Sequence, residues 1–312
     1  MADMRAAVLH KYGAPPECGE FEEPQARDGH VVVDVEAAGV NHLDLLKASG
    51  THFSGPPALP SVIGSDGVGR LPDGRRVFFD AVLSPYGAIA ERTLVPKDAV
   101  CDVADGVDSA VAAALGNTGL AAWLALEWRA KLARGETVLV LGATGAVGSA
   151  AVQIARELGA GRVIAAALPD ERLAKLGADA IVEFDDDDEL TAGLKQAAPD
   201  GVDVIIDPLW GPPAVAAMGA GRRGARHVQI GHMASTTLTL PAPLVRSIAI
   251  DIMGFVIFYV PLEVRRATYL RLTELAARGG LSVDLEVLPI AQIDAAWQRQ
   301  ERGEGTKLVI AP

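Results

Sequence analysis

The sequence E-T-V-L-V-L-G-A-T-G-A-V-G-S-A-A-V-Q-I-A-R-E-L-G, residues 136–159, decides how this chain folds. Residues 137–141 form a short apolar, β-branched run, which is typical of a strand buried on both faces. Three glycines follow at a spacing of three residues. Apolar residues then recur at three- and four-residue steps, which predicts a helix that ends at Gly159. The stretch therefore predicts a strand, a tight glycine turn and a helix.

This glycine turn has the pattern of a dinucleotide-binding site. Backbone N–H groups at a helix N-terminus point outward and the helix dipole favours negative charge, so a pyrophosphate can bind there. We expect the first glycine to permit the turn, the second to admit the phosphates and the third to let helix pack on strand. A glycine turn can also be purely structural, but the flanking strand and helix favour nucleotide binding. The turn residues expected to bind cofactor are Gly142, Thr144, Gly145, Ala146, Val147 and Gly148.

Composition excludes several classes of protein. The 312 residues suffice for two domains, and 50% of them are hydrophobic. The net charge of -12 argues against a nucleic-acid-binding surface. Two cysteines, Cys18 and Cys101, suggest no disulfide framework and cannot form a zinc cluster by themselves. The N-terminus lacks a signal-peptide core, and the apolar stretch 248–260 is too short to span a bilayer. The sequence therefore predicts a cytoplasmic protein without membrane partners.

The order of predicted elements indicates two kinds of domain. The first hundred residues read as mostly β, with a short helix after residue 40. Residues 108–129 read as helical, and we expect the glycines between 116 and 119 to break this helix in two. After the glycine turn, strands at 162–167, 180–184, 202–207 and 227–231 alternate with helices, which predicts a doubly wound parallel sheet. The acidic run 185–189 favours a solvated helix start over a metal site.

Seven motifs follow one another in a characteristic order. They are A-G-V-N-H-L-D at 38–44, L-P-S-V-I-G-S-D-G-V-G at 59–69, G-A-I-A-E-R-T-L-V-P at 87–96, A-A-A-L-G-N-T-G-L-A-A-W at 112–123, G-E-T-V-L-V-L-G-A-T-G-A-V-G at 135–148, G-V-D-V-I-I-D-P-L-W-G at 201–211 and G-T-K-L-V-I at 305–310. Together they resemble the zinc-independent quinone oxidoreductase branch of the medium-chain dehydrogenase/reductase (MDR) family, over nearly the whole chain.

That resemblance implies a two-domain α/β fold. A Rossmann domain with a doubly wound parallel sheet is expected to be inserted into a mostly β, GroES-like catalytic domain. The expected boundaries are 1–115 and 259–312 for the catalytic domain and 116–258 for the Rossmann domain. The resemblance also implies a homodimer, paired through the strand near residues 248–256.

The motifs depart from those of zinc-dependent relatives at the metal positions. Where such relatives carry a cysteine ligand, this chain has Asn41, and where they carry a histidine and a glutamate it has Ser65 and Asp66. A catalytic zinc typically needs three His, Cys or carboxylate ligands, so we expect no metal. Without a Lewis acid, oxidising an alcohol is hard. Reducing a quinone or an α,β-unsaturated carbonyl needs only positioning, desolvation and hydrogen bonds to the oxygen that gains charge.

The resemblance points to three candidate catalytic residues. Asn41 and Asp44 match positions that line the substrate and nicotinamide site, and Asn41 is also a candidate to bind the nicotinamide ribose. Helix capping and solvation are the alternative roles for both residues. His52 stands where relatives commonly have a tyrosine. A histidine with a pKa of about 6.5 could give a proton to the substrate, or the residue could have no role.

NADPH is the expected cofactor. An NAD enzyme of this fold normally carries an acidic residue at the end of the second Rossmann strand, where this chain has Ala167. Arg172 matches the basic residue that similar sequences pair with the 2′-phosphate, although Asp170 lies close by. The resemblance places five further residues along the cofactor: Thr118, Gly231, His232, Gly254 and Phe255.

We therefore predict an NADPH-dependent reductase of small quinones or enones. One alternative is a biosynthetic enoyl reductase acting on a larger acyl or polyketide thioester. Another is a cofactor-binding protein that has lost turnover. The presence of Asn41, Asp44 and the complete glycine turn favours catalysis.

Overall fold

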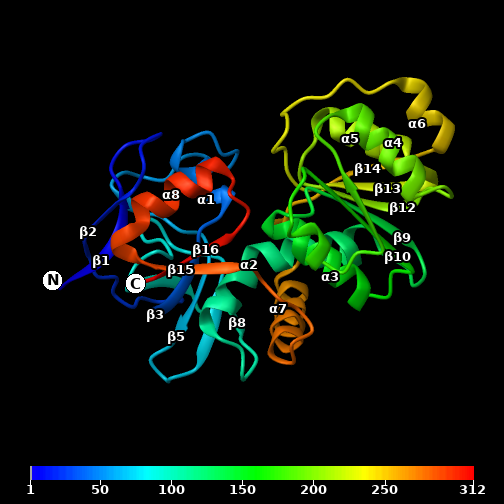
Figure 1. The fold of residues 1–312 in the computed structure, drawn as a ribbon. Coiled ribbons are helices and arrows are strands. Elements are labelled where there is room, and N and C mark those ends of the chain that lie inside the picture. Colours follow the sequence, from blue (N-terminus) through cyan, green and yellow to red (C-terminus); the bar gives the residue numbers. More distant parts are fainter. Residues whose placement is uncertain (1) are drawn as a thin grey trace. The chain divides into compact units, whose positions relative to one another are not determined.

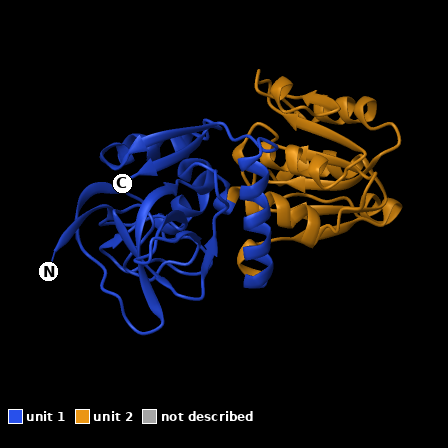
Figure 2. Ribbon diagram, turned by 90° about the horizontal axis from the view of Figure 1, so that it is seen from below, with its two compact units in different colours: residues 1–117, 261–312 blue, residues 118–260 orange. Residues whose placement is uncertain are grey.

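The computed structural model describes residues 2–312, which form two compact units (Figure 2). Unit 1 contains the chain up to Asn117 together with residues 261–312, so both chain ends belong to it. Unit 2 contains residues 118–260.

Unit 2 is built on one parallel sheet of six strands. The strands are β9 (Thr137–Leu141), β10 (Arg162–Ala167), β11 (Ala180–Glu183), β12 (Val202–Asp207), β13 (Gly221–Gln229) and β14 (Asp251–Gly254). They lie in the order β11-β10-β9-β12-β13-β14, and every neighbouring pair is parallel. The chain adds strands first on one side of β9 and then on the other, which is the Rossmann arrangement. The predicted doubly wound sheet is confirmed.

Helices cover both faces of this sheet. The helix α3 (Ala146–Glu157) packs on β9 and β10, while α4 (Asp187–Ala197) and α5 (Gly211–Gly219) lie side by side on the opposite face (Figure 1). The strands β9 and β10 are almost wholly buried, as their apolar composition requires. A short helix, α6 (Ala242–Ile248), precedes β14. The acidic run starts α4 as predicted, because the Asp186 carboxylate accepts hydrogen bonds from Asp188 N and Glu189 N.

Unit 1 consists mainly of antiparallel sheet. The larger sheet contains β15 (Leu285–Pro289), β16 (Lys307–Ala311), β3 (His30–Gly39), β5 (Gly67–Arg70), β6 (Arg76–Phe79) and β8 (Val100–Asp102), with β7 (Arg92–Pro96) also paired to β3. The smaller sheet contains β2 (Glu17–Glu22), β1 (Asp3–Leu9) and β4 (Ser61–Val62). The C-terminal strand β16 pairs with β3, so the last residues of the chain complete the N-terminal sheet (Figure 1).

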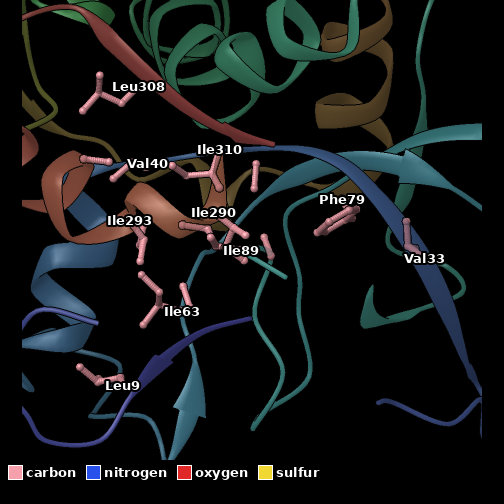
Figure 3. Packing of buried hydrophobic residues seen from close by; sticks show 14 of the residues in the cluster. Leu9, Val33, Val40, Ile63, Phe79, Ile89, Ile290, Ile293, Leu308 and Ile310 are labelled. Atoms are coloured by element: carbon pink, nitrogen blue, oxygen red, sulfur yellow. The ribbon is translucent and has the colours of Figure 1, made fainter. Parts of the chain in front are cut away.

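Three helices accompany these sheets: α1 (His42–Ala48), α7 (Leu262–Ala277) and α8 (Ile293–Arg302). An apolar core joins α1 and α8 to strands of both sheets. Figure 3 shows Val40, Ile293 and Ile310, from segments far apart in sequence, within one buried cluster. Val40 and Leu308, both fully or almost fully buried, fix the backbone beside Asn41 and Lys307. The apolar core thus positions the polar residues described below.

The predicted break in the central helix is wrong. The helix α2 (Ser109–Leu124) is continuous, and a π-helical turn, Ala125–Arg129, extends it. A side chain at Gly116 would overlap the Asp66 carboxylate and the Phe78 ring, so this glycine permits close packing rather than ending the helix. The segment 109–129 is long and apolar enough to cross a membrane, but 72% of its most apolar window is buried, as in the core helix of a soluble protein.

Several other elements differ from the expectation. The strands β2 and β8 and the helix α6 were not predicted. Between β10 and β11, where the alternation predicts a helix, the structure has a single 3-10 turn, Leu173–Lys175. The strand expected at 227–231 begins earlier, at Gly221. The strand β2, E-C-G-E-F-E, is rich in glutamate and largely exposed, so no apolar run marks it in the sequence.

Candidate active site

The glycine turn after β9 has the geometry that nucleotide binding requires. Gly142 adopts a φ of +56°, in the left-handed region that favours glycine. A side chain at Gly148 would overlap the Gly142 carbonyl oxygen and lie 2.8 Å from Ala143 Cα. Only a glycine at position 148 therefore lets α3 pack this tightly on the turn. These two observations agree with the roles expected for the first and third glycines.

The helix start itself is open. Gly145 is the N-cap of α3, and no side chain caps the helix there. The first N–H groups of a helix have no acceptor within it, so this end can bind an anion. A side chain at position 145 would lie 3.3 Å from the Gly142 carbonyl oxygen, and the residues from Thr144 to Val147 are only partly buried. The six turn residues are thus brought together at one open helix start, and their contact with a phosphate stays a prediction.

Other predicted residues lie at the carboxyl ends of the same strands. Ala167 ends β10 and is buried, Gly231 follows β13, and Gly254 ends β14. In an open parallel sheet, ligands bind beyond these strand ends, at the point where the strand order reverses. A side chain at Gly231 would lie 2.7 Å from the Pro208 carbonyl oxygen, so glycine is required there for packing. His232 follows on the same loop and is exposed.

Two predicted cofactor contacts are already engaged within unit 2. Gly254 O accepts a hydrogen bond from Arg129 Nε at 3.1 Å, and Phe255 N donates to Gln229 O at 3.0 Å. The Phe255 side chain is buried, with its ring centroid 6.4 Å from that of Trp128. Thr118 is buried within α2. The roles of these residues toward a nicotinamide stay predictions.

Arg172 is held by a neighbouring carboxylate. Its Nε lies 2.9 and 3.0 Å from the two Asp170 carboxylate oxygens, and its Nη2 lies 2.5 Å from one of them. The hydrogen bond to Arg172 is the main cause that lowers the pKa of Asp170, so this carboxyl group stays charged. A 2′-phosphate would therefore meet an arginine whose charge is largely compensated by Asp170.

In unit 1, the predicted catalytic residues form part of a buried polar cluster. Asn41 Nδ2 donates to Asp66 Oδ1 at 2.6 Å and to Gly39 O at 3.3 Å, while Lys307 Nζ donates to Asn41 Oδ1 at 2.6 Å. Both amide hydrogens of Asn41 are thus used within the protein. The side chain of Asn41 serves this cluster, and its expected contact with a substrate or ribose stays a prediction.

Asp66 and Lys307 are a buried acid and base. Their exposed fractions are 1% and 4%. Asp66 Oδ2 accepts a hydrogen bond from Asn117 N at 2.9 Å, and Lys307 Nζ also donates to Val40 O at 2.8 Å. Burial raises the pKa of Asp66 to about 7, although the charge of Lys307 opposes the rise. Burial likewise lowers the pKa of Lys307. Both shifts have the sign expected for groups removed from water.

Asp44 links the start of α1 to a serine and a second lysine. Asp44 Oδ2 accepts a hydrogen bond from Asn41 N at 2.9 Å, and Asp44 Oδ1 accepts one from Ser65 Oγ at 2.6 Å. Lys47 Nζ then donates to Ser65 Oγ at 3.0 Å. Asp44 does cap the helix, and it also orients Ser65 and, through it, Lys47.

His52 lies in the loop after α1. Its Nδ1 is 2.7 Å from Ser54 Oγ, and its ring contacts that of Phe53 at a tilt of 37°, with centroids 4.2 Å apart. Burial, and to a smaller extent Lys47, lower the pKa of His52. The neutral imidazole is therefore favoured near pH 7, which weakens the case for His52 as a proton source. Its catalytic role stays a prediction.

The sequence alone did not identify several members of this cluster. Ser65 and Asp66 were noted only as departures from a zinc site, and Lys47 and Lys307 were not singled out. A lysine that opens the apolar run K-L-V-I at 307–310 could have been a signal for a buried charge. The spacing of three residues between Asp44 and Lys47 places them on one helix face. Within residues 2–312, no group of three or more His, Cys, Asp or Glu side chains is placed to hold a metal ion.

Comparison with known proteins now places the chain in a family. The crystal structure of quinone oxidoreductase from Thermus thermophilus superimposes with a TM-score of 0.79 and 32% sequence identity, over 99% of this chain and 100% of that one. This chain belongs to the quinone oxidoreductase branch of the MDR family. It is thus an oxidoreductase. The expected combination of a Rossmann-type sheet with a separate antiparallel domain is confirmed.

Two curated relatives and a domain profile agree with the assignment. Quinone oxidoreductase from Sus scrofa is 33% identical over 222 residues, which are 66% of this chain and 66% of that protein. A phenolphthiocerol/phthiocerol polyketide synthase from Mycobacterium tuberculosis is 31% identical over 87% of this chain, but the match spans only 13% of that protein. The profile of the zinc-binding dehydrogenase domain matches residues 146–274.

Proposed function

We propose that this MDR protein is an NADPH-dependent reductase that transfers a hydride to a small quinone or α,β-unsaturated carbonyl without zinc. The observation that carries the proposal is the open N-terminus of α3, where the turn from Gly142 to Gly148 leaves backbone N–H groups for a pyrophosphate. The Thermus relative was solved in complex with NADPH, which supports the same cofactor here.

The residues of unit 2 fit a dinucleotide. Ala167, at the end of β10, places no carboxylate against a 2′-phosphate, and Arg172 supplies the nearby positive charge. The nicotinamide ring supplies the hydride when the cofactor is bound. The protein's task is then to hold the acceptor close and to stabilise the negative charge that develops on its oxygen.

The residues of unit 1 fit reduction without a metal. Asn41, Ser65 and Asp66 occupy positions where zinc-dependent relatives carry ligands, and here all three are hydrogen-bonded to other protein groups. This cluster presents donors and charges without a metal ion, and we propose that Asn41 and Asp44 position the groups that meet the acceptor. The chain is further proposed to be a cytoplasmic homodimer.

An enoyl reductase of polyketide or acyl thioesters is the second candidate. The observation that favours it is the match to the polyketide synthase, which covers 87% of this chain. Acceptor size separates the two candidates, because a small 2-enone and an enoyl thioester present the same conjugated carbonyl on very different carriers.

The test is cofactor oxidation with defined acceptors. NADPH and NADH consumption should be measured separately with a small quinone, a 2-enone and an enoyl thioester, on protein whose zinc content has been determined. We expect faster turnover with NADPH than with NADH, with the quinone or 2-enone, and no loss after chelation. Turnover of the thioester alone would favour the second candidate. Tight NADPH binding with no turnover of any acceptor would contradict the reductase proposal, and stoichiometric zinc would contradict the metal-free site.

A further inference from the structure

Lys47 carries a positive charge, and the buried polar cluster uses only part of its hydrogen-bonding capacity. It lies on α1, three residues after Asp44, and its side chain is half-buried. An ammonium group has three N–H donors. One of them goes to Ser65 Oγ at 3.0 Å, and this is the one hydrogen bond that the Lys47 ammonium makes with side chains or backbone in residues 2–312. Two donors therefore remain available to a ligand.

A chain of hydrogen bonds fixes the position of this ammonium group. Ser65 Oγ gives its proton to Asp44 Oδ1 at 2.6 Å, so its oxygen lone pairs face Lys47. Asp44 is tied in turn to the backbone N of Asn41. Ser65 and Asp44 are 3% and 2% exposed, so water does not compete for these bonds. The ammonium is pre-organised, which is what a charge-stabilising catalytic group requires.

The surroundings of Lys47 suit a conjugated, planar acceptor. Three titratable side chains interact with Lys47. Asp44 does so through Ser65, and His52 and Asp80 interact electrostatically with the ammonium group. Asp80 is paired with Arg265, so its negative charge is already compensated. Lys47 also lies close enough to His52 for its charge to lower the pKa of that residue, and the His52 ring contacts the Phe53 ring at a tilt of 37°. Phe53 is 69% exposed, which leaves most of its aromatic side chain open to a planar ligand.

We propose that Lys47 is a catalytic residue whose ammonium group binds the oxygen of a quinone or enone and stabilises the negative charge that reduction places there. The inference rests on the proposed function and adds the group that stabilises the negative charge on the acceptor oxygen. The cluster of Asn41, Asp44 and Ser65 then acts as a set of positioning residues that hold Lys47.

The reaction balances with groups that the proposal names. For an enone, the hydride forms a new C–H bond at the β-carbon, the C=C electron pair moves to the α-carbon–carbonyl bond, and the carbonyl π pair moves onto oxygen. Lys47 then donates a proton to that oxygen to give the enol, and its neutral amine takes a proton from water. NADPH loses two electrons and the acceptor gains them. With a quinone, the hydride supplies both electrons and one hydrogen, and the Lys47 proton supplies the other hydrogen, which gives the quinol.

The first test needs neither cofactor nor turnover. A chromophoric phenol, whose absorbance reports its ionisation, serves as a mimic of the reduced oxygen. In the wild-type protein we expect the pKa of the bound phenol to fall by about one to three units, as for an acid beside a fixed positive charge. Lys47→Arg should keep much of this shift, and Lys47→Met should abolish it. An equal shift in wild type and Lys47→Met, or no phenolate bound by wild type, would overturn the proposal.

The second test is kinetic. Lys47→Met should lower kcat/KM for the enone by about 10² to 10³-fold, the effect of removing one oxyanion donor. The Kd for NADPH should not change, and Lys97→Met, which alters an exposed lysine of the same unit, should behave as wild type. Unchanged kcat/KM in Lys47→Met would overturn the role of Lys47 and leave the reductase function standing. If the protein binds phenolate in a Lys47-dependent way but reduces neither quinone nor enone, the binding role of Lys47 stands and the reductase function is overturned.

Discussion

Asn41, Asp66 and Lys307 form an acid–amide–base cluster inside unit 1. The Asn41 amide lies between the two charges, donating to Asp66 and accepting from Lys307. Burying a charge is costly unless it is paired and hydrogen-bonded, and here each charge has at least two polar partners. Because these three side chains satisfy one another's hydrogen bonds, the cluster fixes the start of α1, where the proposed site lies.

Asp66 should make the stability of the protein depend on pH in an unusual direction. Its pKa is raised to about 7, so the folded state holds a proton that the unfolded state loses above pH about 4. The free energy of unfolding should therefore fall as pH rises from about 4 to about 7, by at most about 1.4 kcal/mol per pH unit for this one proton. Urea unfolding of wild type and Asp66→Asn at several pH values tests this. The free energy of unfolding of the wild type, relative to that of Asp66→Asn, should fall as pH rises. A relative value that grows with pH would contradict the raised pKa of Asp66.

Lys307→Met should be strongly destabilising. Well above pH 7, where Asp66 is ionised, it leaves the carboxylate buried without its cation, which typically costs about 3–5 kcal/mol. The same change should raise the pKa of Asp66 further, because Lys307 is the largest influence that lowers it. The double variant Asp66→Asn, Lys307→Met should recover part of the lost stability. Equal losses in the single and double variants, measured by urea unfolding, would show that the two side chains do not act as a pair.

At the scale of single residues, the sequence predicted where Asn41 and Asp44 lie better than which groups they contact. Asn41 and Asp44 were correctly placed at one helix start, because the motif A-G-V-N-H-L-D marks it. Their partners could not be read from spacing, since Asp66 is 25 residues and Lys307 is 266 residues from Asn41. A buried lysine is compensated only by tertiary contacts, and a single sequence does not report those.

The β9–turn–α3 element is the best-defined part of the proposed cofactor site, and its glycines should differ sharply in tolerance. Gly148→Ala should abolish nucleotide binding and destabilise unit 2, because the new methyl group would overlap the turn backbone. Gly145→Ala should be milder, since its methyl would lie 3.3 Å from the Gly142 carbonyl oxygen. Gly219→Ala, with no atom within 4 Å, is the matched control and should gain roughly 0.5–1 kcal/mol as a helix substitution. Thermal unfolding and NADPH titration would test this order, and a tolerated Gly148→Ala would contradict the packing argument.

The Asp170–Arg172 pair should set the preference between NADPH and NADH. Asp170→Asn removes the carboxylate that compensates Arg172, so NADPH should bind more tightly while NADH changes little. Arg172→Met should weaken NADPH by about 10-fold or more, the value of a charge-assisted hydrogen bond. Titration of both nucleotides against both variants measures this. Parallel changes for NADPH and NADH would exclude a role at the 2′-phosphate.

At the scale of the whole molecule, we predict that the 32.5 kDa chain forms a homodimer through the edge strand β14. Edge strands present unpaired backbone groups, and Ile252 on β14 is 40% exposed. Light scattering should give twice the chain mass, and Ile252→Lys should shift the protein toward the monomer. A wild-type monomer at micromolar concentration would contradict this part of the proposal.

The overall fold could be predicted because its elements carry strong local signals. The strand β12 has the predicted bounds, since its apolar run begins after Gly201 and ends at Asp207. The errors arose where packing overrides local preference. Gly116 stays helical because it packs against Asp66 and Phe78, and β2 is a strand because β1 pairs with it along its length.

The measurement that most directly tests the account is the fate of the hydride. The protein should be incubated with a 2-enone and NADPH deuterated at nicotinamide C4, using each of the two C4 epimers separately. We predict that one epimer, and not the other, delivers deuterium to the β-carbon of the saturated ketone, and that Lys47→Met slows this transfer without changing its position. Recovery of unlabelled ketone from both epimers, or of unreacted enone with bound NADPH, would contradict hydride transfer to a conjugated carbonyl as the function of this protein.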